Sequence, residues 1–200
     1  MTTRILQIVR EPLKPGSEAA YDAIERDQAR ISKAFGCPHP YLAAESLTGS
    51  KEVWWFNAYE SEDDKQAVYE AYAKNAPLMA ALQKNSAAKT NLTLPPVEIF
   101  ARYRSHAGAG DPWTGGPGRF LVIAVTQDDR IIDGTVFEAA DGTRYVVRAA
   151  RARAEAEAEA VRTPVGPEAT VFAIRPDWSF PDASWIAADP SFWTQPFGRD

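Results

Sequence analysis

The chain has 200 residues, enough for one large domain or two small ones with a core that needs no disulfide. The formal charge of −5 argues against a nucleic-acid partner, and the single cysteine, Cys37, excludes an internal disulfide and a cysteine-cluster zinc site. No apolar run approaches the roughly 20 residues of a membrane span, and the N-terminus has the pattern of a strand rather than a signal peptide, so we expect a cytoplasmic protein without a membrane partner.

The first strand and helix are predicted over residues 4–35. Residues 4–11 alternate as in a strand, and Pro12 and Pro15 close that run. From Ser17 onward, apolar residues recur at three- and four-residue spacing, which predicts a helix that Gly36 ends. We expect the charged residues of this helix on its solvent side. They are Asp22, Glu25, Arg26, Asp27 and Arg30.

A hairpin rich in aromatic residues follows over 40–61. Two strands flank the polar turn at 48–51, and the second strand contains several large β-formers. These are Val53, Trp54, Trp55, Phe56 and Tyr59. Because rings lie on both faces of this strand, neither face can be left in water. We therefore expect helices on one face and a second sheet, a partner chain or a ligand on the other.

A second helix and a fourth strand complete the first segment. Ser61 and Asp64 form a helix start, and Pro77 predicts a break near Asn75 because proline removes a backbone donor. The polar residues 85–93 are expected to lead out of the helix, and 97–104 to form the last strand. Strand, helix, strand, strand, helix, strand gives an antiparallel sheet with both helices on one face.

The second segment repeats this plan with one helix missing. Residues 105–118 are rich in glycine and proline and are predicted to be a linker between a domain at 1–104 and a unit at 119–200. The predicted elements are strands over 119–126, 135–139 and 143–147, a helix over 148–161, a strand over 169–175 and a short helix over 182–188. The aromatic tail from residue 176 is expected to pack along the surface.

Residues 4–104 resemble the dimeric α/β-barrel superfamily, whose ferredoxin-like modules include the antibiotic-biosynthesis-monooxygenase (ABM) and NIPSNAP-like domains. The likeness rests on the element order, the ring-rich strand EVWWFNAYES and the helix YEAYAKNAPLMAAL with its internal proline. It implies an α+β fold in which a ferredoxin-like βαββαβ module and a degenerate second ferredoxin-like unit close face to face. The barrel would form in a homodimer or from two repeats within one chain.

The resemblance also implies candidate catalytic residues. Trp55, Asn57 and Tyr59 share one strand face, and some cofactor-free ABM-type oxygenases use an asparagine, a tryptophan and a tyrosine on a polyphenolic substrate. An amide and a phenol can hold an enolate oxygen while an indole excludes water. The alternative is that the rings only pack the sheet and that Asn57 bonds locally. The candidate substrate-binding residues are Arg10, His39, Tyr41, Glu45 and Tyr103.

No metal or cofactor is expected. His39 and His106 are the only histidines, both are predicted in loops, and neither stands in a metal-ligand pattern. Haem-degrading relatives carry a histidine on the second helix, which has none here. Two functions remain: a cofactor-independent, monooxygenase-like enzyme on an aromatic or enolisable substrate, or a non-catalytic ligand-binding or protein-interaction module with a packed barrel. The sequence does not decide whether the protein is an enzyme.

Overall fold

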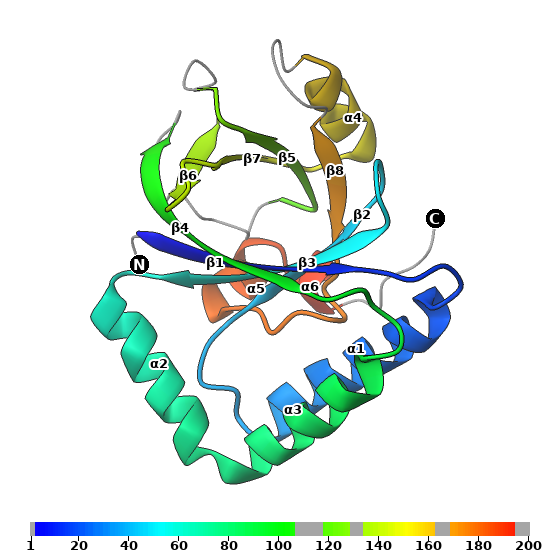
Figure 1. Cartoon of the computed structure of the whole chain (residues 1–200), viewed down its shortest axis with the longest axis vertical. Coiled ribbons are helices and arrows are strands. Elements are labelled where there is room, and N and C mark those ends of the chain that lie inside the picture. The colour runs from blue at the N-terminus through cyan, green and yellow to red at the C-terminus, as the bar shows by residue number, and fades with distance from the viewer. Residues whose placement is uncertain (1–2, 107–117, 129–133, 163–168, 195–200) are drawn as a thin grey trace.

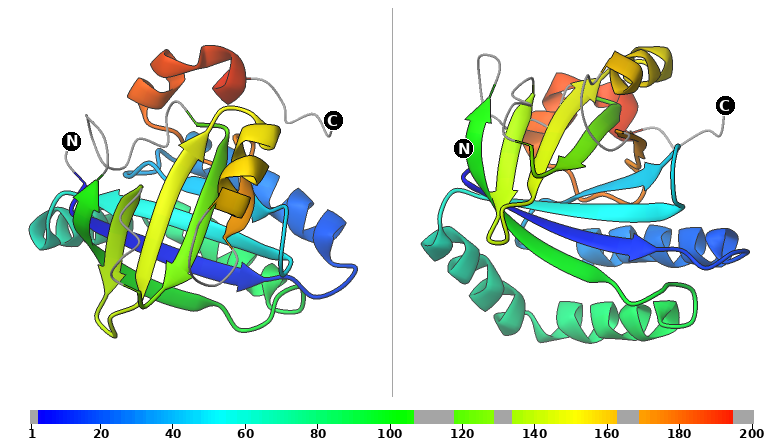
Figure 2. Two further views of the ribbon diagram at one scale, coloured as in Figure 1. Left: turned by 90° about the horizontal axis from the view of Figure 1, so that it is seen from above. Right: turned by 45° about the horizontal axis from the view of Figure 1, so that its top comes forward.

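Eight antiparallel strands form one closed barrel within a single chain (Figures 1 and 2). The computed structural model describes residues 3–106, 118–128, 134–162 and 169–194. The strands are β1 (Ile5–Pro12), β2 (Leu42–Ser46), β3 (Glu52–Tyr59), β4 (Val97–His106), β5 (Phe120–Thr126), β6 (Thr135–Ala139), β7 (Arg144–Ala150) and β8 (Thr170–Ile174). Their order around the barrel is β1-β3-β2-β8-β5-β7-β6-β4, so the pairs β2–β8 and β4–β6 join the two halves of the chain.

Helices cover the barrel on two sides and at one end. They are α1 (Glu18–Ala34), α2 (Glu62–Lys74), α3 (Ala76–Lys89), α4 (Arg153–Arg162), α5 (Ala183–Ala188) and α6 (Pro190–Thr194). The first three lie below the sheet formed by β1 and β3 in Figure 1, and α4 packs on β5, β7 and β8. The short helices α5 and α6 lie behind the barrel in that view.

The prediction that the strand at 52–59 is dry on both faces is confirmed. Trp54 is 3% exposed and Trp55 is 7% exposed, although they point to opposite sides of β3. Trp54 and Phe56 pack in the barrel interior, where the second half of the chain supplies Phe172 and Tyr145. Trp55 packs on the helix side of the same sheet. The two halves of the chain therefore cover each other's apolar sheet faces.

Apolar side chains pack in the barrel interior, and the C-terminal tail packs against one end of it. Trp193 belongs to the interior cluster, with Trp185 and Phe192 packed against it. Arg119 holds this tail through a bidentate ion pair to Asp189, with Nη2–Oδ2 at 2.9 Å. The expectation that the aromatic tail packs along the surface was wrong for its last part, because Trp185, Phe192 and Trp193 join the barrel core.

Helices α2 and α3 are separated by a break at Asn75. The Ser61 hydroxyl accepts from the Asp64 amide at 3.1 Å and caps α2 as expected. The chain then breaks at Asn75, which ends α2 and caps α3, and Pro77 stands in the first turn of α3, where its missing donor costs nothing. Contrary to expectation, α3 continues through the polar residues beyond 84 as far as Lys89.

The joint between the two halves differs from the expected linker at its start. Strand β4 runs on through Ser105 and His106, which pair with Val136 and Thr135 of β6. The rest of the predicted linker, 107–117, lies outside the described residues. In the part of the chain that the structure describes, no helix has the length and apolar character needed to cross a bilayer.

The interior contact between Trp54 and Phe172 predicts a large stability effect. Replacing Phe172 by Ala should lower the free energy of unfolding by about 3–5 kcal/mol, because it removes a fully buried ring that packs on Trp54 and leaves a cavity there. Urea denaturation measures the change. Val161→Ala is the control, since Val161 is 87% exposed and should shift stability by less than about 0.5 kcal/mol. Equal, small effects of both substitutions would contradict the packing described.

Candidate functional site

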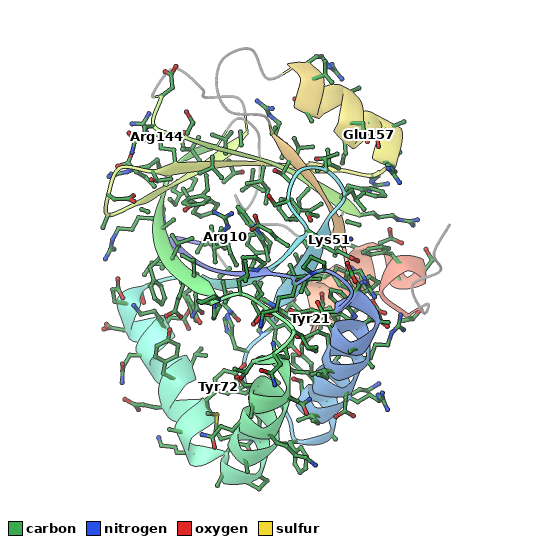
Figure 3. All side chains as sticks on the ribbon, turned by 45° about the vertical axis from the view of Figure 1, so that its right-hand side comes forward. Arg10, Tyr21, Lys51, Tyr72, Arg144 and Glu157 are labelled. Atoms are coloured by element: carbon green, nitrogen blue, oxygen red, sulfur yellow. The ribbon has the colours of Figure 1, made fainter. Side chains whose placement is uncertain are left out.

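The main cavity lies between the outer face of the first sheet and helices α1 to α3, outside the barrel. Its volume is about 500 Å³, within the range of small-molecule pockets. Figure 3 shows Tyr21 and Tyr72 on this helix side of the sheet and Arg10 on the barrel side. The cavity is lined by Val9, Glu11, Gln28, Ser32, Tyr41, Trp55, Asn57, Tyr69, Tyr72, Ala73, Met79, Leu82 and Lys89. The walls are thus largely aromatic and apolar, with a few polar groups.

Trp55, Asn57 and Tyr41 of the predicted site meet in this cavity. Asn57 is half-buried on β3, and its side chain has no hydrogen-bond partner among the described residues. Gln28 on α1 also lines the cavity, and its side chain likewise has no hydrogen-bond partner among the described residues. The Tyr41 hydroxyl is engaged, since it lies 2.9 Å from Ser32 Oγ. The two free amides offer both donors and acceptors to a ligand.

Tyr59 and His39 lie on the same sheet face but behind the cavity wall. The Tyr59 hydroxyl donates to Gln7 Oε1 at 2.9 Å, and its ring stacks on the imidazole of His39 with centroids 4.8 Å apart. His39 is only 4% exposed, and burial lowers its pKa. The imidazole is therefore neutral near pH 7 and packs flat against the Tyr59 ring.

The remaining predicted binding residues are separated from this cavity. Arg10 and Tyr103 lie on the barrel side: Arg10 forms an ion pair with Glu52 at 2.9 Å and stacks over Trp54, and Tyr103 packs on Phe137. Glu45 lies on the helix side but does not line the cavity. Its carboxylate pairs with Lys51 at 2.7 Å and with Arg175 at 2.7 Å.

A smaller hollow opens on the barrel side of the sheet. Its volume is about 180 Å³, and Arg10, Trp54 and Phe172 are among the residues that line it. The guanidinium of Arg10 is already neutralised by the bidentate contact to Glu52. Within the described residues, no group of three or more His, Cys, Asp or Glu side chains is placed to hold a metal ion.

A buried ion cluster forms one end of the main cavity. Lys89, at the last turn of α3, places Nζ 2.8 Å from Glu25 Oε1 of α1 and 3.2 Å from Glu11 Oε1 of β1. Lys89 is 8% exposed and Glu25 is 0% exposed. Lys89 and Glu11 line the cavity, whereas Glu25 lies behind them.

Aromatic donors hold the Glu11 carboxylate in place. The Tyr21 hydroxyl and Trp55 Nε1 both donate to Glu11 Oε2, the latter at 3.1 Å. Lys89 Nζ donates to the same carboxylate, so Glu11 accepts from three groups. Burial, together with the charges of Glu25 and Glu11, raises the pKa of Tyr21 well above its usual value, so this phenol stays protonated.

Burial also affects the protonation of Glu25 and Lys89. Desolvation raises the pKa of Glu25 to about 7, against the opposing pull of the Lys89 charge. For Lys89, burial works toward a lower pKa, but the charges of Glu25 and Glu11 outweigh it and raise the pKa. Lys89 is therefore a cation at neutral pH, whereas Glu25 changes its charge in that range.

This cluster was not predicted from the sequence. Glu25 was expected in solvent, and this was wrong because α1 turns it toward Lys89. Lys89 falls in the polar stretch that was expected to lead out of the second helix. One signal was available: Tyr21, Glu25, Gln28 and Ser32 recur at spacings of four, three and four residues, which places them on one helix face with an aromatic side chain.

Solved structures of similar shape are known, although sequence comparisons find no relative. Neither a scan of family models nor a search of curated proteins gave a match. A putative monooxygenase from Fusobacterium nucleatum aligns over 86% of this chain and 93% of its own, with TM-score 0.52 and 9% identity. A second of that name, from Lactobacillus acidophilus, aligns over 86% and 94%, with TM-score 0.48 and 10% identity. The likeness to the Fusobacterium structure covers the whole α+β barrel fold. At these identities the likeness concerns the fold alone.

Titration of Glu25 should be visible as pH-dependent stability. Its pKa in the fold lies above that of an unfolded glutamate, so unfolding releases a proton and stability falls as pH rises from about 4.5 through about 7. At about 1.4 kcal/mol per pKa unit, the loss is on the order of 3 kcal/mol. Glu25→Gln should remove this component and be more stable than the wild type at about pH 8.

Urea unfolding of both proteins between about pH 5 and 8 measures the difference. Glu70→Gln, at an exposed position on α2, is the matched control and should leave the pH profile as it is in the wild type. A wild-type profile that runs parallel to that of Glu25→Gln would show that Glu25 does not titrate in this range.

Proposed function

We propose that the cavity between β3 and the helices binds an aromatic or enolisable small molecule, and that the protein is an ABM-type, monooxygenase-like enzyme without a cofactor. The observation that carries this proposal is Asn57. Its free amide faces a cavity of about 500 Å³ beside the Trp55 indole. A polar side chain with no hydrogen-bond partner among the described residues, on a largely aromatic wall, supports a ligand with an oxygen to be hydrogen-bonded.

The chemistry follows from the groups on the wall. The Asn57 amide can donate to a carbonyl or enolate oxygen, and the protonated Lys89 adds a positive charge at one end of the cavity. Tyrosine and tryptophan rings keep water from the bound ring system. Stabilising the enolate lets the substrate lose a proton to solvent, and dioxygen then adds to the electron-rich carbon. Overall, a ring methylene and O₂ give a carbonyl and water.

A second candidate, binding without turnover, is favoured by the state of Glu11. Among the described residues that line the cavity, Glu11 is the only carboxylate, and its oxygens already accept from three donors of the protein. A pocket with donors but no free base holds an aromatic ligand and leaves it unchanged. The aromatic packing of the barrel interior is compatible with both candidates, since the main cavity lies outside the barrel.

Dithranol, an enolisable three-ring ketone, separates the two candidates. The enzyme should accelerate its oxidation to the anthraquinone over buffer, and Asn57→Ala should lower kcat/KM by about 100-fold, the loss typical of removing one oxyanion donor. Asn91→Ala, at an exposed site, is the control and should retain full activity. Oxygen consumption and anthraquinone absorbance are the readouts. Saturable quenching of tryptophan fluorescence with no acceleration would refute turnover and leave the binding role.

A further inference from the structure

The ion cluster at the end of the cavity has an unbalanced charge. With both carboxylates ionised, Glu11, Glu25 and Lys89 sum to −1 in a region where Glu25 has no solvent exposure. A buried excess charge is costly, and the cost is relieved when one carboxylate takes a proton. The contacts show which one: Glu11 accepts from Tyr21, Trp55 and Lys89, whereas Glu25 has Lys89 as its one ion-pair partner among the described residues.

The groups facing Glu25 come from every neighbouring element. Lys89 approaches from α3, Glu11 from β1 and Tyr21 from one turn earlier on α1, and Tyr41, just before β2, interacts with Glu25 electrostatically. Both phenols have raised pKa values and remain neutral. Lys89 remains charged. Glu25 is therefore the member of this set whose charge changes near neutral pH.

Lys89 is the point at which a ligand meets this cluster. Among the described residues that line the cavity it is the only cation, and it lies within 5.4 Å of the Trp55 ring centroid. An aromatic ligand packed on Trp55 thus brings any acidic substituent close to the ammonium group. While Glu25 is ionised, the two carboxylates outweigh Lys89 and repel such a substituent. Once Glu25 is protonated, the cluster is neutral and the Lys89 charge is available.

We propose that the ligand of this cavity is an aromatic compound with one anionic oxygen group, a carboxylate or a phenolate, which binds against Lys89 while Glu25 takes up a proton. The inference rests on the proposed binding function and adds the ligand's charge and the proton linked to it. It makes Lys89 a specificity-determining residue. Glu25, which does not line the cavity, is a positioning residue that acts through Lys89.

Two probes of equal shape test the proposal: 2-naphthoate, which is anionic, and 2-naphthamide, which is neutral. Calorimetric titration between about pH 5.5 and 8.5 should show naphthoate affinity falling up to about tenfold per pH unit above about pH 7, as linkage to one proton requires. Naphthamide affinity should not change. Near pH 7.5, the naphthoate enthalpy should vary between phosphate and Tris buffers in proportion to proton uptake.

Variants assign the effect to residues. Glu25→Gln mimics the protonated state, so it should bind naphthoate at all these pH values with no proton uptake. Lys89→Gln should lose about tenfold or more in naphthoate affinity and retain naphthamide binding. Lys84→Gln, an exposed lysine on the same helix, is the control and should behave as the wild type. The Glu25 variant alone suffices if Lys89→Gln does not fold.

The outcomes separate this inference from the function on which it rests. Naphthamide binding with equal or weaker binding of naphthoate, or a pH-independent naphthoate affinity, would overturn the inference and leave the aromatic pocket in place. Failure of both probes to bind would count against the pocket itself and the inference with it. A pH dependence that persists in Glu25→Gln would remove Glu25 from the account.

Discussion

The two-sided burial of β3 is the constraint on which the rest of the structure depends. Trp54 and Trp55 are neighbours in sequence and point to opposite faces, so both faces of the sheet must be covered. The second half of the chain covers the Trp54 side by closing the barrel, and helices α1 to α3 cover the Trp55 side. Under the first cover, apolar side chains pack in the barrel core. The second cover leaves a cavity of about 500 Å³ between the sheet and helices α1 to α3.

That cavity combines an apolar wall with an ion cluster that solvent barely reaches. Burying Lys89 with two carboxylates contributes little stability, since desolvation offsets most of the attraction. What the cluster provides is a cation at a defined position beside an aromatic ring, and a carboxyl group that titrates near neutrality. Both are properties of a ligand site more than of a structural core.

The sequence predicted the fold to a large extent and the site only in part. Ring crowding in β3, the Ser61 cap and Pro77 are local signals, and they located the elements and the break between α2 and α3. The alternation of β1 could not show whether Arg10 or Glu11 faces the helices, because a shift of one residue exchanges the two faces. Glu25 and Lys89 are 64 positions apart, so only the packing of α1 on α3 reveals their contact.

The most direct test of this account is the pair of indole N–H signals of Trp54 and Trp55 in a ¹H–¹⁵N spectrum, assigned with Trp54→Phe and Trp55→Phe. The account predicts that added 2-naphthoate shifts the Trp55 signal, whose N–H donates to Glu11 at the cavity wall, and leaves the Trp54 signal inside the barrel in place. A shift of Trp54 with Trp55 unchanged would place the ligand in the barrel and contradict the assignment of the two faces.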